Sequence, residues 1–166
     1  MNWYKTSNNN EIEKRIKKIL KTHPFTKKLM NIYNIDPNNV DNNLEIKIVD
    51  LSKDFAKGNG KEIFLDKNLF GKSFSNFLDN NFHFVIHEFL HWLKRRHEYS
   101  FYFNDPEEIQ SFVMAIAWEM INGKKDKEIL KKIHPIVEKH FGNKERCNLM
   151  ISKMFDKANK FLENNR

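Results

Sequence analysis

Two histidines four residues apart, with a glutamate directly after the first, form the segment of this sequence best suited to chemistry. The segment is His87-Glu88-Phe89-Leu90-His91. On an α-helix this spacing is about 40° of rotation and one turn of rise, so both imidazoles leave the same face and can bind one metal ion. Glu88 lies about 100° round from His87, too far to ligate but near enough to reach a water at the metal. The pattern predicts zinc-dependent hydrolysis with Glu88 as general base.

The surroundings of this motif favour a metal site over a chance match. Strings of this type occur by chance in long helices, so the context has to decide. The stretch from Phe82 to Leu93 is the most apolar of the chain. Two histidines and a glutamate would be costly to bury there unless they were paired or bound to a metal.

A catalytic zinc ion normally takes three protein ligands and leaves one position for water, so a third ligand is needed. His97 gives the histidine spacing of the metzincin zinc motif, but that motif turns the chain at a glycine where this sequence has Lys94. If the helix continues, His97 points about 80° away from His87. We interpret His97 as a solvated residue at the helix end, with ligation as the alternative.

Two glutamates at the start of the next helix are stronger candidates. Asp105-Pro106 is a helix start signal, with aspartate as the cap and proline in the first turn, and Glu107 and Glu108 follow it. The apolar residues that define the buried face of this helix are Ile109, Phe112, Ile116 and Met120. This face has Glu108 on its margin, whereas Glu107 points away. Glu108 is the predicted third ligand, with a capping role alone as the alternative.

Further polar residues could support the site. Glu119 is a reserve ligand, or a partner that could orient a ligating histidine. We prefer its simpler interpretation, an ordinary charge near the helix end. A hydrogen-bond donor for the developing oxyanion could come from His97, Tyr99 or Tyr102 in the loop after the motif, although packing or solvation explains each of them equally well.

These residues need a mainly helical framework. Apolar residues at helical spacing predict helices over about 11–21, 25–35, 73–97, 105–122, 125–140 and 144–163. Alternation predicts strands around 44–49 and 63–65, and Gly58-Asn59-Gly60 signals a turn. The two strands could form a hairpin or part of a small antiparallel sheet over about 44–66, and the Asn-rich stretch 38–43 is expected to be a loop. We predict an α+β fold with the motif on a central helix.

Length and composition are those of a soluble protein with a core. The chain has 166 residues, which fits one domain over 1–166 with packing helices at 11–35 and 125–163. Hydrophobic residues make up 40% and aromatic residues 13%, enough to bury a core. The lone Cys147 cannot form an intrachain disulfide, which favours a reducing compartment, the cytoplasm. No uncharged apolar run reaches the ~20 residues of a membrane span, so no membrane partner is expected.

The net charge of +7 raises the question of a nucleic-acid partner, because a basic surface attracts nucleic acids, membranes and acidic proteins. The basic groups are Lys14-Arg15, Lys17-Lys18, Lys94-Arg95-Arg96 and Lys131-Lys132. We interpret them as solvated helix faces balanced by neighbouring Glu and Asp residues. Nucleic-acid binding is the alternative.

The sequence resembles the ImmA/IrrE type of compact metallopeptidase, and phage-encoded relatives most of all. The resemblance lies in the segments His87–His91 and Asp105–Phe112 and in the short aromatic loop between them. In that type one helix carries H-E-x-x-H and the next carries E-x-E-A-x-x-x-A, whose first glutamate is the third zinc ligand. Glu108 is the matching position. The sequence departs from the pattern at Gln110, often Glu, and Ser111, often Ala, and neither change removes a ligand.

The resemblance covers about residues 62–122 and implies a zincin-like fold with a gluzincin-like site. In such a site His87, His91 and Glu108 bind Zn²⁺, and Glu88 activates water for attack on a peptide carbonyl. It also implies that the strand at 62–66 lines the cleft and holds a protein or peptide substrate in extended form. Regulatory members of the type cut a repressor protein. A viral relative would act in the host cytoplasm or be packaged in the virion.

Two other functions compete with a peptidase. The first is a catalytically inactive, zinc-binding structural or virion-associated protein on a zincin scaffold. Intact Glu88 argues against it, because structural zinc sites close four ligands and need no base. The second is a DNA-associated metalloprotease or a basic nucleic-acid-binding module. SprT-like proteases share H-E-x-x-H but take a third histidine downstream, and His134 is too distant to match their spacing.

Overall fold

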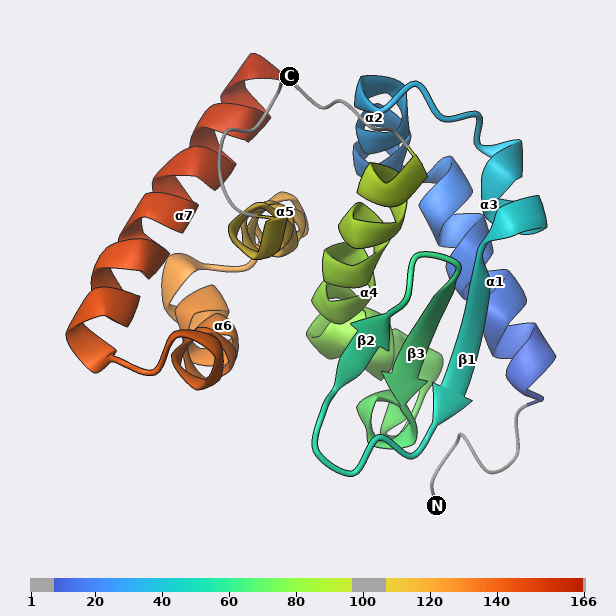
Figure 1. Cartoon of the computed structure of the whole chain (residues 1–166), viewed down its shortest axis with the longest axis horizontal. Coiled ribbons are helices and arrows are strands. Elements are labelled where there is room, and N and C mark those ends of the chain that lie inside the picture. The colour runs from blue at the N-terminus through green and yellow to red at the C-terminus, as the bar shows by residue number, and fades with distance from the viewer. Residues whose placement is uncertain (1–7, 97–106, 166) are drawn as a thin grey trace. The chain divides into compact units, whose positions relative to one another are not determined.

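The computed structural model describes residues 8–96 and 107–165 of the chain, apart from the side chain of Arg96 (Figure 1). The chain forms two compact units, Met1–Asn104 and Asp105–Arg166. The first unit combines helices with a sheet, and the described part of the second is helical. The predicted α+β class is therefore confirmed. Two compact units can make up one domain or two, so the single domain stays a prediction.

The first unit begins with two helices joined at His23. Helix α1 spans Asn9–Thr22 and is capped by Asn8, whose Oδ1 accepts a hydrogen bond from the Asn10 backbone N–H at 3.1 Å. Helix α2 spans Pro24–Ile32, with proline at its first position, and the His23 Nδ1 accepts from the Phe25 backbone N–H at 3.2 Å. The histidine closes one helix and caps the next, as the predicted break at His23-Pro24 requires.

The predicted loop at 38–43 is wrong, because these residues form a short helix, α3 (Asn38–Asn43). The Asp36 side chain accepts a hydrogen bond from the Asn38 backbone N–H at 2.7 Å and starts the turn. Val40 is 0% exposed and anchors the helix in the core. Asparagine has a low helix propensity, so local capping and the burial of one valine outweigh it here.

Three strands form a mixed sheet in the order β1-β3-β2: β1 (Glu45–Val49), β2 (Ala56–Gly58) and β3 (Glu62–Asp66). Strands β2 and β3 pair antiparallel around the predicted turn, whereas β1 and β3 pair parallel. The two predicted strands are therefore parallel neighbours and not a hairpin, and the small antiparallel sheet expected over about 44–66 is a mixed one. A parallel pair needs a connection of about a dozen residues, and the segment 50–61, which contains β2, provides it.

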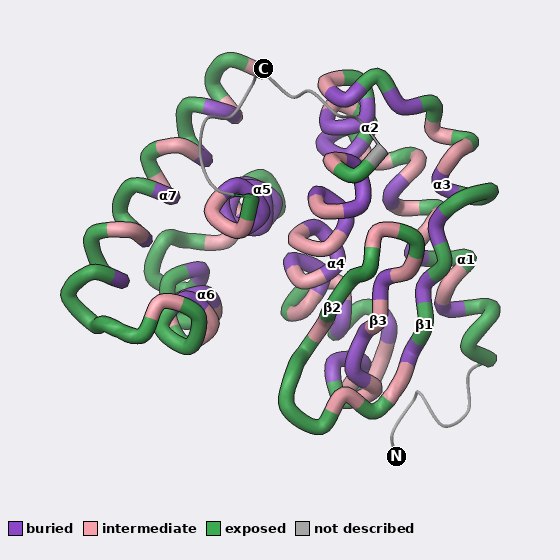
Figure 2. The backbone as a smooth tube through the Cα atoms, in the orientation of Figure 1, coloured by how far each residue is buried: buried purple, intermediate pink, exposed green. Residues whose placement is uncertain are grey.

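Helix α4 (Phe74–Arg96) is the predicted central helix. It packs against β2 and β3, while α1 packs against β1 (Figure 1). A 3-10 turn, η2 (Lys67–Phe70), leads from the sheet towards α4. The Phe70 ring of η2 stacks on the Phe77 ring of α4, with centroids 4.3 Å apart, and this contact holds the first turns of α4 in place. Figure 2 shows the buried positions of the first unit gathered where the sheet meets these helices.

The second unit contains α5 (Glu107–Ile121), α6 (Asp126–Phe141) and α7 (Lys144–Asn164), with α7 packed on both of the others. These bounds confirm the predicted helices within a few residues. The predicted start signal at Asp105-Pro106 lies outside the described residues. Helix α5 ends before Gly123, whose φ of +78° is the left-handed conformation that glycine adopts readily.

Candidate metal centre

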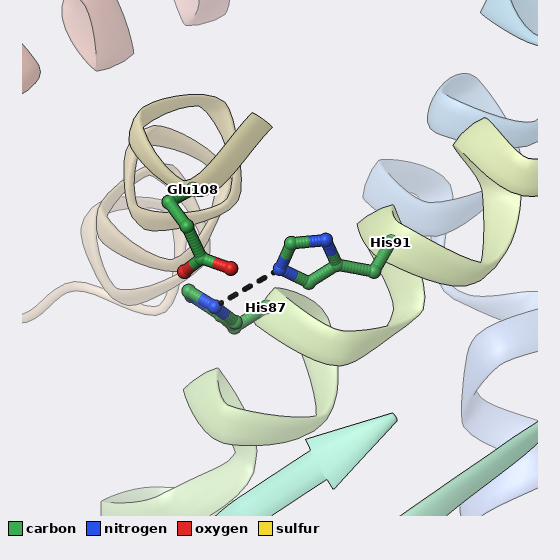
Figure 3. Close-up of side chains that lie close together, drawn as sticks. All are labelled: His87, His91 and Glu108. Atoms are coloured by element: carbon green, nitrogen blue, oxygen red, sulfur yellow. Dashed lines mark hydrogen bonds between the residues drawn. The ribbon is translucent and has the colours of Figure 1, made fainter. Parts of the chain in front are cut away.

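His87 and His91 lie one turn apart on α4, with their Nε2 atoms 3.3 Å from each other (Figure 3). Their rings are tilted by 58°, with centroids 5.1 Å apart. Two nitrogens bound at about 2.0–2.1 Å to a tetrahedral zinc ion would be about 3.3–3.4 Å apart. The helical spacing puts both rings on one face, and their side-chain conformations hold the two nitrogens at the separation that a shared zinc ion requires.

Glu108, from the start of α5, joins this pair. One ligand atom from each of His87, His91 and Glu108 lies within 4.8 Å of the others, and all three residues are half-buried (Figure 3). Two imidazoles and a carboxylate are a donor set that suits zinc. This is a possible metal-binding His-His-Glu group whose geometry resembles H-E-x-x-H…E, and it is the one such group within residues 8–96 and 107–165.

The single buried face predicted for α5, which placed Glu108 on its margin and Glu107 away from it, is wrong. Glu107 is exposed and Glu108 half-buried, as predicted. However, ten consecutive residues of α5, from Gln110 to Glu119, are buried, so the helix has no single buried face in this stretch. Ile109 and Met120, which were expected to define that face, are only half-buried.

Glu119 lies apart from the His-His-Glu group. Its side chain is 2% exposed, so the preferred interpretation as an ordinary charge near the helix end is wrong. The Lys132 ammonium group of α6 donates a hydrogen bond to Glu119 Oε2 at 2.9 Å. A buried carboxylate requires such a partner, so the ion pair with Lys132 accounts for how Glu119 can be buried in the second unit.

Glu88 follows His87 on α4 and lies beside the sheet. It is half-buried, and a Cβ atom built on Gly58 would come within 2.9 Å of Glu88 Oε2. The carboxylate therefore lies against the backbone of β2. No sequence pattern indicated this contact, because β2 is only three residues long and Gly58 carries only a turn signal.

Contrary to what the resemblance implied, the strand at 62–66 cannot hold an extended substrate along its edge. Strand β3, at 62–66, is the central strand and pairs with β1 on one side and β2 on the other. Both of its edges are therefore occupied. The strand edge that lies next to Glu88 belongs to β2 instead.

The outer face of the sheet carries a compact charge cluster. The Lys47 ammonium group donates a hydrogen bond to Glu62 and lies 3.3 Å from Glu45, and these carboxylates, Glu62 first, raise the pKa of Lys47. Lys47 and then Asn59 lower the pKa of Glu62. The Asn59 side-chain amide donates to Glu62 at 2.6 Å, which ties the turn between β2 and β3 to the sheet.

Several of the basic groups have partners within the chain. Lys17 pairs with Glu13 and Lys132 with Glu119, each at 2.9 Å, and the Arg15 guanidinium lies 4.1 Å from the centre of the Phe74 ring. The interpretation of the basic groups as balanced helix faces stays a prediction. Nucleic-acid binding stays an untested alternative.

The possible oxyanion donors His97, Tyr99 and Tyr102 lie outside the described residues, as does any ligand role for His97. Every helix of the described part of the chain is too short or too polar to cross a lipid bilayer.

Comparisons with known proteins place the chain in no family. No family model matches the sequence, and neither the curated proteins nor the solved structures yield a significant match. The fold class and the His-His-Glu group therefore stand on the sequence and the structure alone.

Proposed function

We propose that the chain is a zinc-dependent peptidase in which His87, His91 and Glu108 hold Zn²⁺ and Glu88 is the general base. The observation that carries the proposal is the arrangement of the two carboxylates. Glu108 belongs to the three-residue group, whereas Glu88 adjoins a ligand histidine and faces a strand edge. Structural zinc sites close four protein ligands, while catalytic sites use three and keep one position open.

Glu88 moves protons in this proposal. When bound, zinc supplies a Lewis acid that lowers the pKa of water and polarises a carbonyl oxygen. The Glu88 carboxylate accepts a proton from the attacking water as its oxygen forms a bond to the peptide carbonyl carbon. The same carboxyl group then donates that proton to the amide nitrogen as the C–N bond breaks. The products are a carboxylic acid and an amine, and at neutral pH the acid then releases its proton, which the amine can take up.

Strand β2 can hold the peptide. The Asp66 backbone N–H donates to the Phe55 carbonyl at 2.9 Å, and the Asn59 N–H donates to the Glu62 carbonyl at 3.1 Å. In an antiparallel ladder alternate residues bond to the partner, so the backbone groups of Ala56 and Gly58 point away from β3. An extended peptide can add to such an edge through main-chain hydrogen bonds, preferably antiparallel. Its scissile bond would then lie beside Glu88.

Metal analysis and a peptidase assay on matched variants test this function. We expect one zinc ion per chain in the parent protein and in Glu88→Gln, with cleavage of a degenerate peptide mixture, followed by mass spectrometry, reduced about 10²–10⁴-fold in the variant. Glu108→Gln should lose zinc, whereas the same change at exposed Glu107 should not. Absence of zinc from the parent protein, or undiminished cleavage by Glu88→Gln, would contradict the proposal.

A further inference from the structure

The segment 55–60 runs along α4 in the same direction as the helix, with three contacts in order. The Phe55 ring stacks on Phe84, with centroids 5.1 Å apart and planes 29° from parallel. Gly58 then faces Glu88 at the helix centre, where a Cβ would meet Oε2 at 2.9 Å. Along β2, a pair of aromatic rings therefore lies at the N-terminal end of the strand edge, and the proposed general base, Glu88, comes next.

The opposite end of the same edge is cationic. A Cβ on Gly60 would lie 2.5 Å from Cδ and 2.9 Å from Nη1 of Arg95, so this side chain packs against the turn after β2. Gly60 lacks the Cβ that would block this approach, and its φ of +86° is the left-handed conformation that the turn uses. The turn therefore supports the Arg95 side chain, which is nevertheless exposed to solvent.

Helix geometry gives the spacing between this arginine and the base. Arg95 follows Glu88 by seven residues, which is almost two full turns, so both lie on one face about 10.5 Å apart along the axis. An extended peptide rises about 3.3 Å per residue, so Arg95 lies roughly three residues from Glu88 along a bound strand. Phe55, 54% exposed, lies on the other side of Glu88.

We propose that Arg95 selects substrates with an acidic side chain about three residues to the N-terminal side of the scissile bond. The proposal rests on the peptidase function above. Because β2 runs from the aromatic end to the arginine end, a peptide bound antiparallel has its N-terminal part at Arg95 and its C-terminal part at Phe55 and Phe84. A guanidinium group can bind a carboxylate through two parallel hydrogen bonds. The substrate class is an extended peptide with an acidic residue before the cut and an apolar residue after it.

Peptide pairs and a charge reversal test this selection. The zinc-loaded full-length protein is assayed on decapeptides that differ only in Glu or Lys three residues before the cut found in the degenerate mixture. Binding of the same peptides to zinc-loaded Glu88→Gln is measured by fluorescence anisotropy. We expect the Glu peptide to bind and react about tenfold better, and Arg95→Glu to reverse the preference. Arg146→Glu on α7, an exposed site with the same charge change, is the control and should behave like the parent protein.

The outcomes separate this inference from the peptidase function. Cleavage with equal use of both peptides, or an acidic preference that survives Arg95→Glu, would overturn the selection and leave the function intact. Absence of cleavage by the zinc-loaded parent would refute the function, and Glu88→Gln would then report on peptide recognition alone. If that variant binds neither peptide, or both with one affinity, the selection is refuted as well. An unchanged melting temperature of Arg95→Glu shows that any effect is local.

Discussion

Gly58→Ala tests whether the contact between β2 and Glu88 matters for catalysis. The new Cβ would lie 2.9 Å from Glu88 Oε2, whereas relaxed carbon–oxygen contacts are about 3.3–3.6 Å, so the carboxylate has to move by roughly 0.5 Å. A misplacement of about 1 Å at a reacting group can cost about 10²-fold in rate. We expect kcat to fall about tenfold, with KM changed much less.

The fold and the metal site should tolerate this substitution. Gly58 has no positive φ, so alanine fits its backbone, and replacing glycine at a compatible position stabilises a protein by about 0.4–1 kcal/mol. The next nearest atom to the new Cβ, the Glu62 carbonyl oxygen, is 3.4 Å away, which requires only a slight shift. We therefore expect an unchanged zinc content and a melting temperature at or slightly above that of the parent.

A double-mutant cycle shows whether the loss acts through Glu88. If Gly58→Ala lowers kcat only by displacing the carboxylate, it should not lower the residual kcat of a Glu88→Ala protein any further. If Gly58→Ala alone has the kcat of the parent protein, the contact between β2 and Glu88 has no role in catalysis. An equal loss in both backgrounds would show that β2 itself, and not the position of Glu88, is disturbed.

Three further predictions concern stability. Lys132→Met leaves the buried Glu119 carboxylate without this partner and should cost about 3 kcal/mol in urea unfolding, with partial recovery when Glu119→Gln is added. Burial lowers the pKa of His23 below 6.5, so the unfolded chain binds a proton more readily than the folded chain. The free energy of unfolding should therefore fall as the pH drops through 6.5. His23→Asn, which keeps a capping side chain that does not titrate, should flatten this pH dependence when it is followed by the melting temperature. Val40→Ala should cost about 2 kcal/mol in urea unfolding, because two buried methyl groups of α3 are lost.

The sequence predicted what local periodicity controls. Ile12, Ile16 and Leu20 recur at helical spacing, and all three are buried on α1. The same regularity places His87 and His91 on one face of α4, because the geometry of residues four apart does not depend on the rest of the fold. Helix bounds and the histidine pair were therefore accessible without a structure.

Features that depend on distant partners were not accessible. Strand β2 reads Ala-Lys-Gly, a segment with no strand propensity, and forms only because β3 supplies its hydrogen bonds. The parallel pairing of β1 with β3 likewise depends on where the connecting segment passes. The burial of α5 from Gln110 to Glu119 exceeds what a one-sided apolar pattern predicts, so that pattern was a weak reason to choose Glu108.

Gly58 and Gly60 show how one sequence signal can carry two structural requirements. Their spacing correctly predicted a turn, and Gly60 has the positive φ that such a turn uses. Both also lack the side chain that would collide with α4, Gly58 at Glu88 and Gly60 at Arg95. A turn alone could be built with asparagine at either position, since asparagine tolerates the left-handed region. A side chain at either position would have to displace the end of an α4 side chain, so these two positions link the strand edge to the proposed base and to the proposed substrate-selecting arginine.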